Sequence, residues 1–164
     1  MKELQLIRHG KSSWKEGLPD HSRPLAPRGE RAAPEMGRRL QAAGAVPDCL
    51  LSSDAVRARA TAHAIAEAAG LGADTVALDA SLYEADASDL LACARGLDDA
   101  YTRVALVGHN PTIAAAAEWL CGLQAHKVPT AAVIRIRFPV ARWAELAPGA
   151  GELIDFDYPK RSSA

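Results

Sequence analysis

The chain has 164 residues, a length that suits a single domain around one hydrophobic core. Nineteen basic residues nearly balance twenty acidic ones, so net charge favours neither a nucleic acid nor a membrane as partner. There is no signal-peptide pattern and no long apolar span. The three cysteines lack metal-ligand spacing and are predicted to be buried free thiols in a cytoplasmic protein. Any anion site must therefore be local.

The first half of the chain begins with a predicted strand over 4–8, which ends at a His-Gly turn. A polar loop over 11–29 follows, and then a helix that stops at Gly44. Pro34 is expected to start, kink or break this helix because proline lacks an N–H. A second buried strand is predicted over 49–51.

Further elements alternate between helices and strands. Ser52-Ser53-Asp54 offers N-cap groups for an Ala-rich helix that ends near Gly70. Asn110-Pro111 should start a helix that ends near Gly122. The remaining predictions are a helix over 88–96, strands over 75–78, 103–107, 133–138, 143–146 and 153–156, and a frayed tail over 160–164. This alternation favours an α/β fold, a three-layer α/β/α sandwich with a mostly parallel central sheet and antiparallel strands at its edge.

Two histidines occupy equivalent places after predicted strands. His9 follows the first strand, and His109 follows the strand over 103–107. In open α/β sheets ligands bind beyond the carboxyl ends of the strands, so both imidazoles should face one crevice. A single histidine in such a place is as often structural as functional, but two in matching positions favour function.

Two arginines are placed to join the histidines. Arg8 directly precedes His9, and Arg57 lies one turn into the helix that follows Ser53. The planar guanidinium group matches phosphate oxygens, although Arg57 could equally be a solvated surface residue. Arg59 points about 200° away on the same helix and is predicted to be exposed.

Three motifs together resemble the histidine phosphatase superfamily, whose fold is phosphoglycerate mutase-like. Leu6-Ile7-Arg8-His9-Gly10 resembles its Arg-His-Gly signature, Ser53-x-x-x-Arg57-Ala58-x-x-Thr61 its second motif, and Val107-Gly108-His109-Asn110-Pro111 its third. Arg8-His9-Gly10-Lys11-Ser12-Ser13-Trp14 and Asp20-His21-Ser22-Arg23-Pro24-Leu25 with Arg28-Gly29 are similar to the SixA-type phosphohistidine phosphatases. The large insertion of phosphoglycerate mutases has no room between residues 62 and 104.

The resemblance implies a mechanism without metal or other cofactor. His9 would be the nucleophile, attacking as neutral imidazole while its other nitrogen donates to a backbone carbonyl. Arg8, Arg57 and His109 would surround the phosphoryl oxygens, with the backbone N–H of Asn110 as a further donor. A metal site built from the two histidines is a minority alternative.

The proton donor is the residue that the resemblance identifies least specifically. In the wider superfamily an acidic residue from the region of Leu82-Tyr83-Glu84-Ala85 protonates the leaving oxygen. Glu84 is the best match and Asp86 the second, although Glu84 could simply be a polar loop residue. An imidazole leaving group, with a pKa near ~6.5, needs less protonation than an alkoxide.

The loop after His9 supplies candidates for substrate binding. Lys11, Ser12 and Arg23 could bind substrate at the mouth of the site, or make ordinary surface ion pairs. Trp14 is expected to pack beneath this loop, with contact to a protein substrate as the alternative, and Trp119 and Trp143 to be core or partly buried. His21, His63 and His126 are predicted to be structural or exposed.

The leading functional hypothesis is a phosphatase that acts on a phosphohistidine in a protein. The alternatives are a phosphatase for small phosphomonoesters, a non-catalytic phosphate-binding module and, last, a mutase-type transferase. Neither a nucleic acid nor a membrane is expected as partner, and the oligomeric state is not predicted.

Overall fold

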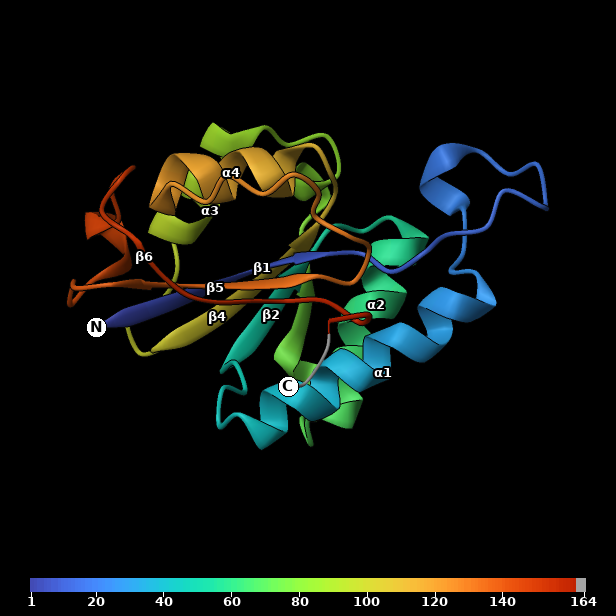
Figure 1. Cartoon of the computed structure of the whole chain (residues 1–164), viewed down its shortest axis with the longest axis horizontal. Coiled ribbons are helices and arrows are strands. Elements are labelled where there is room, and N and C mark those ends of the chain that lie inside the picture. The colour runs from blue at the N-terminus through green and yellow to red at the C-terminus, as the bar shows by residue number, and fades with distance from the viewer. Residues whose placement is uncertain (162–164) are drawn as a thin grey trace.

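The computed structural model describes residues 1–161. The fold contains one six-stranded sheet with the strand order β3-β2-β4-β1-β5-β6 (Figure 1). β1 to β4 are mutually parallel where they pair, whereas β5 runs antiparallel to β1 and β6 antiparallel to β5. The strands are β1 (Lys2–Arg8), β2 (Cys49–Ser52), β3 (Val76–Leu78), β4 (Arg103–Gly108), β5 (Val133–Phe138) and β6 (Glu152–Asp157).

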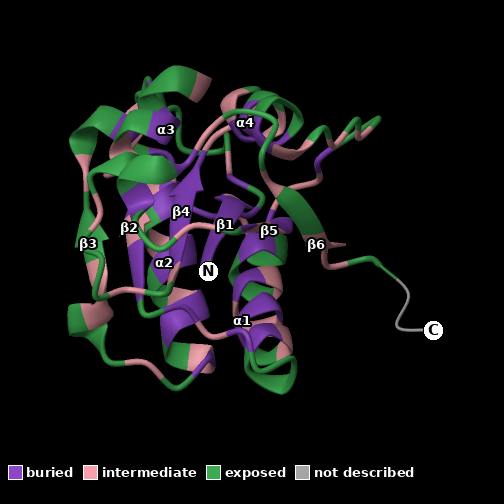
Figure 2. Ribbon diagram, turned by 90° about the vertical axis from the view of Figure 1, so that its left-hand side faces the viewer, coloured by how far each residue is buried: buried purple, intermediate pink, exposed green. Residues whose placement is uncertain are grey.

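Helices cover both faces of this sheet, which makes the predicted three-layer α/β/α architecture correct. α1 and α2 lie on one face, and α3 and α4 on the other (Figure 2). Their bounds are α1 (Pro27–Ala42), α2 (Val56–Ala68), α3 (Ala87–Arg95) and α4 (Thr112–Cys121). Among the described residues, no helix is long and apolar enough to cross a membrane.

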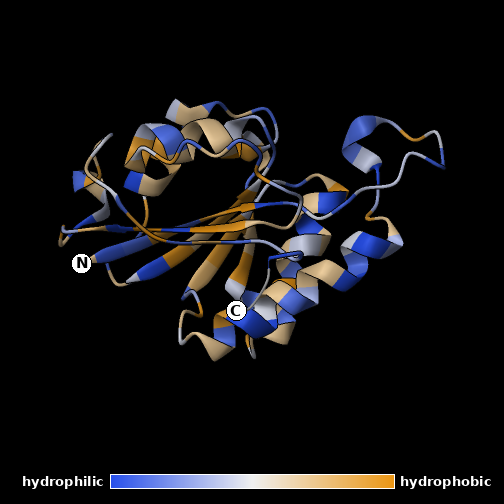
Figure 3. Ribbon diagram, in the orientation of Figure 1, coloured by the Kyte–Doolittle hydropathy of each residue, from blue (hydrophilic) through white to orange (hydrophobic). Residues whose placement is uncertain are grey.

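The core has two parts because the sheet separates them. Alternate residues of a strand point to opposite faces, so Leu6 of β1 packs with α3 and α4 while Ile7 packs with α1 and α2. Hydrophobic segments run along the strands between the two layers of helices (Figure 3). β1 and β4 are buried on both faces. The sequence of β4 is nearly continuously apolar, as expected for such a strand, whereas β1 also buries Lys2, Glu3 and Gln5.

Two predictions at helix boundaries are wrong in informative ways. α2 begins at Val56 without a side-chain cap, because the Ser53 hydroxyl accepts from the Ala55 N–H and also pairs with His109. α1 begins already at Pro27, inside the predicted loop, and continues through Pro34. Proline is favourable at the first helical position, and within a helix it removes one hydrogen bond.

The strand predicted over 143–146 is also wrong: Trp143–Glu145 is a short 3-10 helix. Trp143 is fully buried, and its indole N–H donates to the Tyr101 carbonyl at 3.0 Å. Burial of one large aromatic side chain therefore decides this segment rather than sheet pairing. The strand predicted over 153–156 is present as β6.

Other packing predictions are mixed. Cys49 is buried, whereas Cys93 and Cys121 are only partly buried. Trp14 is 71% exposed, so the prediction that it packs beneath the loop is wrong. Trp119 is 41% exposed, so the prediction that it is core or partly buried is wrong as well. Of the predicted frayed tail, Arg161 is paired with Asp155, and residues 162–164 lie outside the described part of the chain.

Candidate active site

The carboxyl ends of three adjacent strands bring the sequence motifs together. β2, β4 and β1 are neighbours in the sheet, and they are followed by Ser53, His109 and His9. The backbone joins them directly, since the His9 N–H donates to the Gly108 carbonyl and the Ser53 N–H to the Val107 carbonyl, both at 3.0 Å. The sheet thus fixes the two histidines, whose ring centroids are 5.1 Å apart.

The tautomer of His9 follows from its hydrogen bonds. Nδ1 lies 2.7 Å from the Gly10 carbonyl, which can only accept, so Nδ1 carries the proton. The predicted backbone carbonyl is therefore that of Gly10. Nε2 keeps its lone pair, and this lone pair faces the Nε–H of Arg57 at 3.3 Å.

Arg57 is the central cation of the site. Its side chain is buried, and its guanidinium reaches His9 through Nε and His109 Nδ1 through Nη2 at 3.4 Å. The reading of Arg57 as a solvated surface residue is excluded. An arginine so placed presents a rigid fork of donors to both imidazoles.

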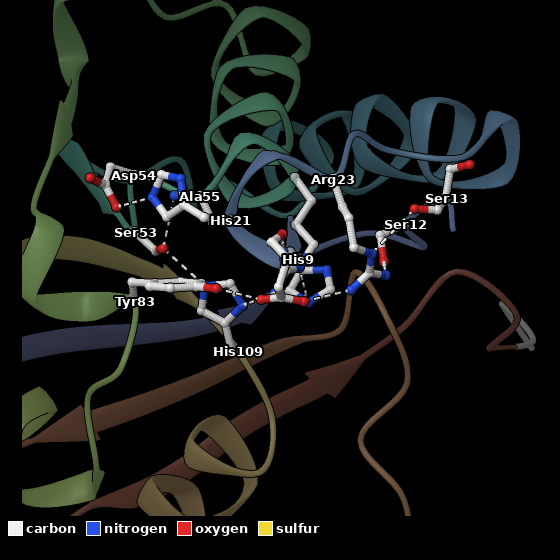
Figure 4. A network of polar contacts seen from close by, with 12 residues as sticks. His9, Ser12, Ser13, His21, Arg23, Ser53, Asp54, Ala55, Tyr83 and His109 are labelled. Atoms are coloured by element: carbon white, nitrogen blue, oxygen red, sulfur yellow. Dashed lines mark hydrogen bonds and ion pairs between the residues drawn. The ribbon is translucent and has the colours of Figure 1, made fainter. Parts of the chain in front are cut away.

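His109 has the opposite tautomer. Because the Arg57 guanidinium only donates, Nδ1 of His109 accepts and Nε2 carries the proton, which it donates to the Ser53 hydroxyl at 2.9 Å. Ser53 is fully buried and thereby fixes the orientation of this ring. Figure 4 shows His9, His109, Ser53 and Tyr83 around one centre.

Both imidazoles are held neutral. Desolvation by burial, together with the positive charges of Arg57 and Arg8, lowers the pKa of His9 to about 3. Burial and Arg57 lower the pKa of His109 to about 4. A neutral imidazole is the form in which an unprotonated ring nitrogen, here Nε2 of His9, can act as a nucleophile.

Two contacts tie the first motif to the helices behind it. The Thr61 hydroxyl accepts from the Gly10 N–H at 3.0 Å and donates to the Arg57 carbonyl at 2.8 Å. Gly29 of α1 lies so close to the turn after His9 that a Cβ there would come 2.3 Å from the Lys11 carbonyl oxygen. Only glycine permits this approach.

Asp20 is a residue of the site that sequence analysis missed. Its carboxylate accepts from Arg57 Nη2 at 3.0 Å, from Arg23 Nη1 at 2.8 Å and from the Tyr83 hydroxyl. The hydrogen bond from Tyr83, and then those from Arg23 and Arg57, hold the pKa of this carboxyl far below its usual range. The Asp20 carboxylate thus forms an ion pair with Arg57, the arginine that contacts His9. The only feature of the sequence that could have identified Asp20 is its position three residues before Arg23 in the SixA-like segment. We call His9, Arg57, His109 and Asp20 the His9 cluster.

The sequence matches the family model of the histidine phosphatase superfamily (branch 1) over residues 4–92. The chain belongs to the histidine phosphatase superfamily. A relative from Mycobacterium tuberculosis, described only as an uncharacterized protein, is 34% identical, and the match covers 94% of this chain and all of the relative.

Solved structures place this histidine phosphatase in the SixA-type branch. A proposed phosphohistidine phosphatase SixA from Nakamurella multipartitia superposes with a TM-score of 0.86 at 27% identity, covering 98% of this chain and 97% of the other. A protein histidine phosphatase SixA complexed with tungstate shares the fold, with a TM-score of 0.80, 19% identity and coverage of 96% and 97%. The protein is therefore a phosphatase.

The remaining predicted residues of this phosphatase divide into two groups. Arg23 is buried in the loop, where it donates to Asp20 and to the Ser12 hydroxyl, and its guanidinium lies 3.2 Å from the centre of the exposed Trp14 ring. Arg23 and Ser12 therefore hold the loop and Asp20 together. Arg8 donates to the Val128 carbonyl at 2.8 Å, and its charge acts on both histidines.

The other candidates lie outside the His9 cluster. Lys11 and Glu84 are exposed. The Asn110 side chain donates to the Val128 carbonyl at 3.2 Å and accepts from the Ala114 N–H at 3.2 Å, so it supports the start of α4. Asp86 caps α3 in a reciprocal capping box with Asp89.

Proposed function

We propose that this phosphatase transfers the phosphoryl group of its substrate to Nε2 of His9 and then to water, without a metal ion. The observation that carries the proposal is the meeting of three groups: the unprotonated Nε2 of His9, the Arg57 guanidinium 3.3 Å from it, and the His109 ring beside both. Phosphoryl transfer needs mainly alignment and stabilisation of charge on the phosphoryl oxygens, which this arrangement supplies.

In the first step the lone pair of Nε2 forms a bond to phosphorus. The bond from phosphorus to the leaving group breaks, and the leaving group departs with the electron pair and takes up a proton. The Nδ1–H bond to the Gly10 carbonyl stabilises the positive charge that develops on the His9 ring. Arg57, Arg8 and His109 surround the three phosphoryl oxygens, and the Asn110 backbone N–H is the proposed further donor.

In the second step water attacks phosphorus on the side opposite to His9. The bond between phosphorus and Nε2 breaks, its electron pair returns to the imidazole, and a proton from the water is released to solvent. Neutral His9 and inorganic phosphate result. For phosphate dianion to engage Arg57, the carboxylate of Asp20 must leave it, because two anions would otherwise share one guanidinium.

The proposed substrate is a phosphohistidine carried by another protein. Asp20, the carboxyl group that contacts Arg57, is held ionised and is a poor proton donor. This favours a leaving group such as imidazole, which departs with little help. The exposed Trp14 on the loop beside the cluster supplies an aromatic surface of the kind that protein partners bind, and the likeness to a proposed SixA supports the same class.

The test is to trap the phosphoenzyme. Incubation with a phosphohistidine-containing protein labelled on phosphorus, followed by rapid denaturation in alkali, should yield one acid-labile phosphohistidine at His9. His9→Ala should abolish label and turnover, whereas the control His63→Ala, an exposed histidine of α2, should retain both. Turnover that persists in His9→Ala would contradict the proposal, and a non-catalytic module would show neither label nor turnover. Loss of activity in excess chelator would favour the alternative of a metal site.

The second candidate is a phosphatase for small phosphomonoesters, which would need a proton donor for an alkoxide. Glu84 is the proposed donor because it follows Tyr83, whose hydroxyl reaches Asp20 of the His9 cluster. We predict that Glu84→Gln slows hydrolysis of aliphatic phosphomonoesters by at least about tenfold and slows phosphohistidine hydrolysis much less. Steady-state kinetics with both substrates measure this ratio. Equal losses would rule out Glu84 as the donor.

A further inference from the structure

A second basic region lies next to the His9 cluster. It is a cavity of about 470 Å³ between the turn after β1, the first turns of α1, the loop before β5 and the segment after β6. Five of the side chains that line it are cationic: Arg8, Lys11, Arg28, Lys127 and Lys160. We call it the basic cavity. Its volume falls within the range of small-molecule sites, about 300–1,000 Å³.

In the described part of the chain, no carboxylate neutralises the charges of the basic cavity. No Asp or Glu is among the residues that line it. Within residues 1–161, no carboxylate forms an ion pair with any of these five cations. Elsewhere in the described chain most arginines are paired, as Arg39 is with Glu35 and Asp157. In a protein of net charge −1, five unpaired cations around one cavity produce a local field that attracts anions.

Hydrogen bonds hold the walls of the basic cavity in place. The segment after β6 is held by Arg39, which donates to the Tyr158 and Pro159 carbonyls, each at 2.9 Å. Arg8 is fixed by its bond to the Val128 carbonyl, while its Nε is buried without a hydrogen-bond partner in the described structure. The Tyr158 ring, together with Pro129 and Pro159, adds apolar surface beside the charges.

We propose that the basic cavity binds a small molecule that carries a diphosphate group. A single phosphate neutralises fewer than half of five cations, whereas a diphosphate carries about three negative charges and can contact several segments at once. The volume leaves room for an organic group beside the diphosphate, and the Tyr158 ring offers it a surface for stacking. The bare diphosphate and an organic diphosphate share this chemistry, and the experiment separates them.

The cavity is coupled to the His9 cluster through Arg8. This residue lines the cavity, directly precedes His9, and is one of the charges that lower the pKa of both histidines. An anion in the cavity offsets part of that charge.

Calorimetric titration with pyrophosphate tests the proposal directly. Wild-type protein should bind one equivalent, and Arg28→Gln/Lys127→Gln should weaken binding at least about tenfold, since charge-assisted contacts are lost. The matched control Lys15→Gln/Arg31→Gln removes two exposed cations outside the cavity and should change the dissociation constant by less than about twofold. The side chains of Arg28 and Lys127 make no hydrogen bond within residues 1–161 and are exposed, so the thermal midpoint should be unchanged. Measuring this midpoint detects any loss of fold separately.

The outcomes distinguish the ligand sources. Adenosine diphosphate binding more tightly than pyrophosphate, with adenosine alone weak, supports an organic diphosphate; equal affinities support the bare diphosphate. The proposal would be overturned if pyrophosphate did not bind to the wild-type protein, or if both double variants weakened its binding equally. Tighter binding of hexaglutamate than of pyrophosphate would also overturn it, in favour of an acidic peptide as the ligand. Pyrophosphate binding should persist in His9→Ala, so its result stands whether or not His9 is phosphorylated. Loss of binding in that variant would assign the anion to the His9 cluster instead and would refute a separate site.

Discussion

The His9 cluster and the basic cavity are adjacent and both cationic, yet they are built in opposite ways. In the cluster, Arg57 is buried and each of its three nitrogens donates to a partner: Nε to His9, Nη1 to the Asp20 carbonyl, and Nη2 to the Asp20 carboxylate and His109. In the cavity, Lys11, Arg28, Lys127 and Lys160 are exposed. The difference teaches how one protein separates two tasks: fixed geometry suits phosphoryl transfer, whereas free charge suits reversible anion binding.

The largest effect should follow from changing geometry in the cluster while keeping its charge. Arg57→Lys retains the cation but loses the planar fork that contacts His9, His109 and Asp20. We expect kcat for phosphohistidine to fall about 10²–10³-fold, as for loss of a preorganised donor. In the cavity, the matched change Lys127→Arg should alter pyrophosphate affinity less than about threefold. A similar small change in kcat for Arg57→Lys would remove the contrast between the two regions.

A smaller loss is expected for Ser53→Ala, which removes the acceptor for His109 Nε2–H. The His109 ring should then lose its single tautomer, and kcat should fall about tenfold. Nitrogen-15 NMR of His109 should show the protonated Nε2 in wild type and a mixture in the variant. A purely structural role would instead lower the thermal midpoint and leave the tautomer unchanged, which would contradict positioning by Ser53. Ser53→Thr keeps the hydroxyl and should restore the tautomer.

Asp20→Asn tests whether the Asp20 carboxylate competes with the substrate for Arg57. Removing the carboxylate charge leaves Arg57 free of an ion pair, so the phosphoryl mimic vanadate should bind severalfold more tightly, about three- to tenfold. Competitive inhibition measures this affinity. The control Glu16→Gln changes an exposed carboxylate of the same loop and should leave it unchanged. Weaker vanadate binding in Asp20→Asn would show that the carboxylate supports the site rather than competes with the substrate.

The smallest expected effect is on the pH dependence of the free energy of unfolding. Burial lowers the pKa of His9 to about 3 and that of His109 to about 4, from 6.5. The unfolded chain therefore takes up protons first, so the free energy of unfolding should decrease as pH falls from about 6.5 towards 4. Urea unfolding at pH 7 and pH 5 measures this decrease, which His9→Gln should reduce and His63→Gln should not. NMR titration should find both imidazoles neutral at pH 5.5, and a midpoint near 6.5 for either would contradict desolvation of the cluster.

Sequence patterns predicted the parts of this protein that depend on local periodicity. The apolar runs over 4–8 and 103–107 identified the strands β1 and β4. The rule that parallel strands present ligands at their carboxyl ends then placed His9, His109 and Arg57 together. Local rules failed at Trp143, because burial of its indole against the Tyr101 carbonyl outweighs strand propensity.

The sequence by itself determined the three-layer α/β/α fold and the residues that converge on His9, because hydrophobic periodicity and the order of the motifs are local properties of the sequence. The tertiary structure alone decided that Asp20 reaches Arg57 across 37 residues, that Trp14 stays exposed, and that cations from four distant segments line one cavity. Such contacts join segments far apart in sequence, and their free energy depends on how loops pack against the finished sheet.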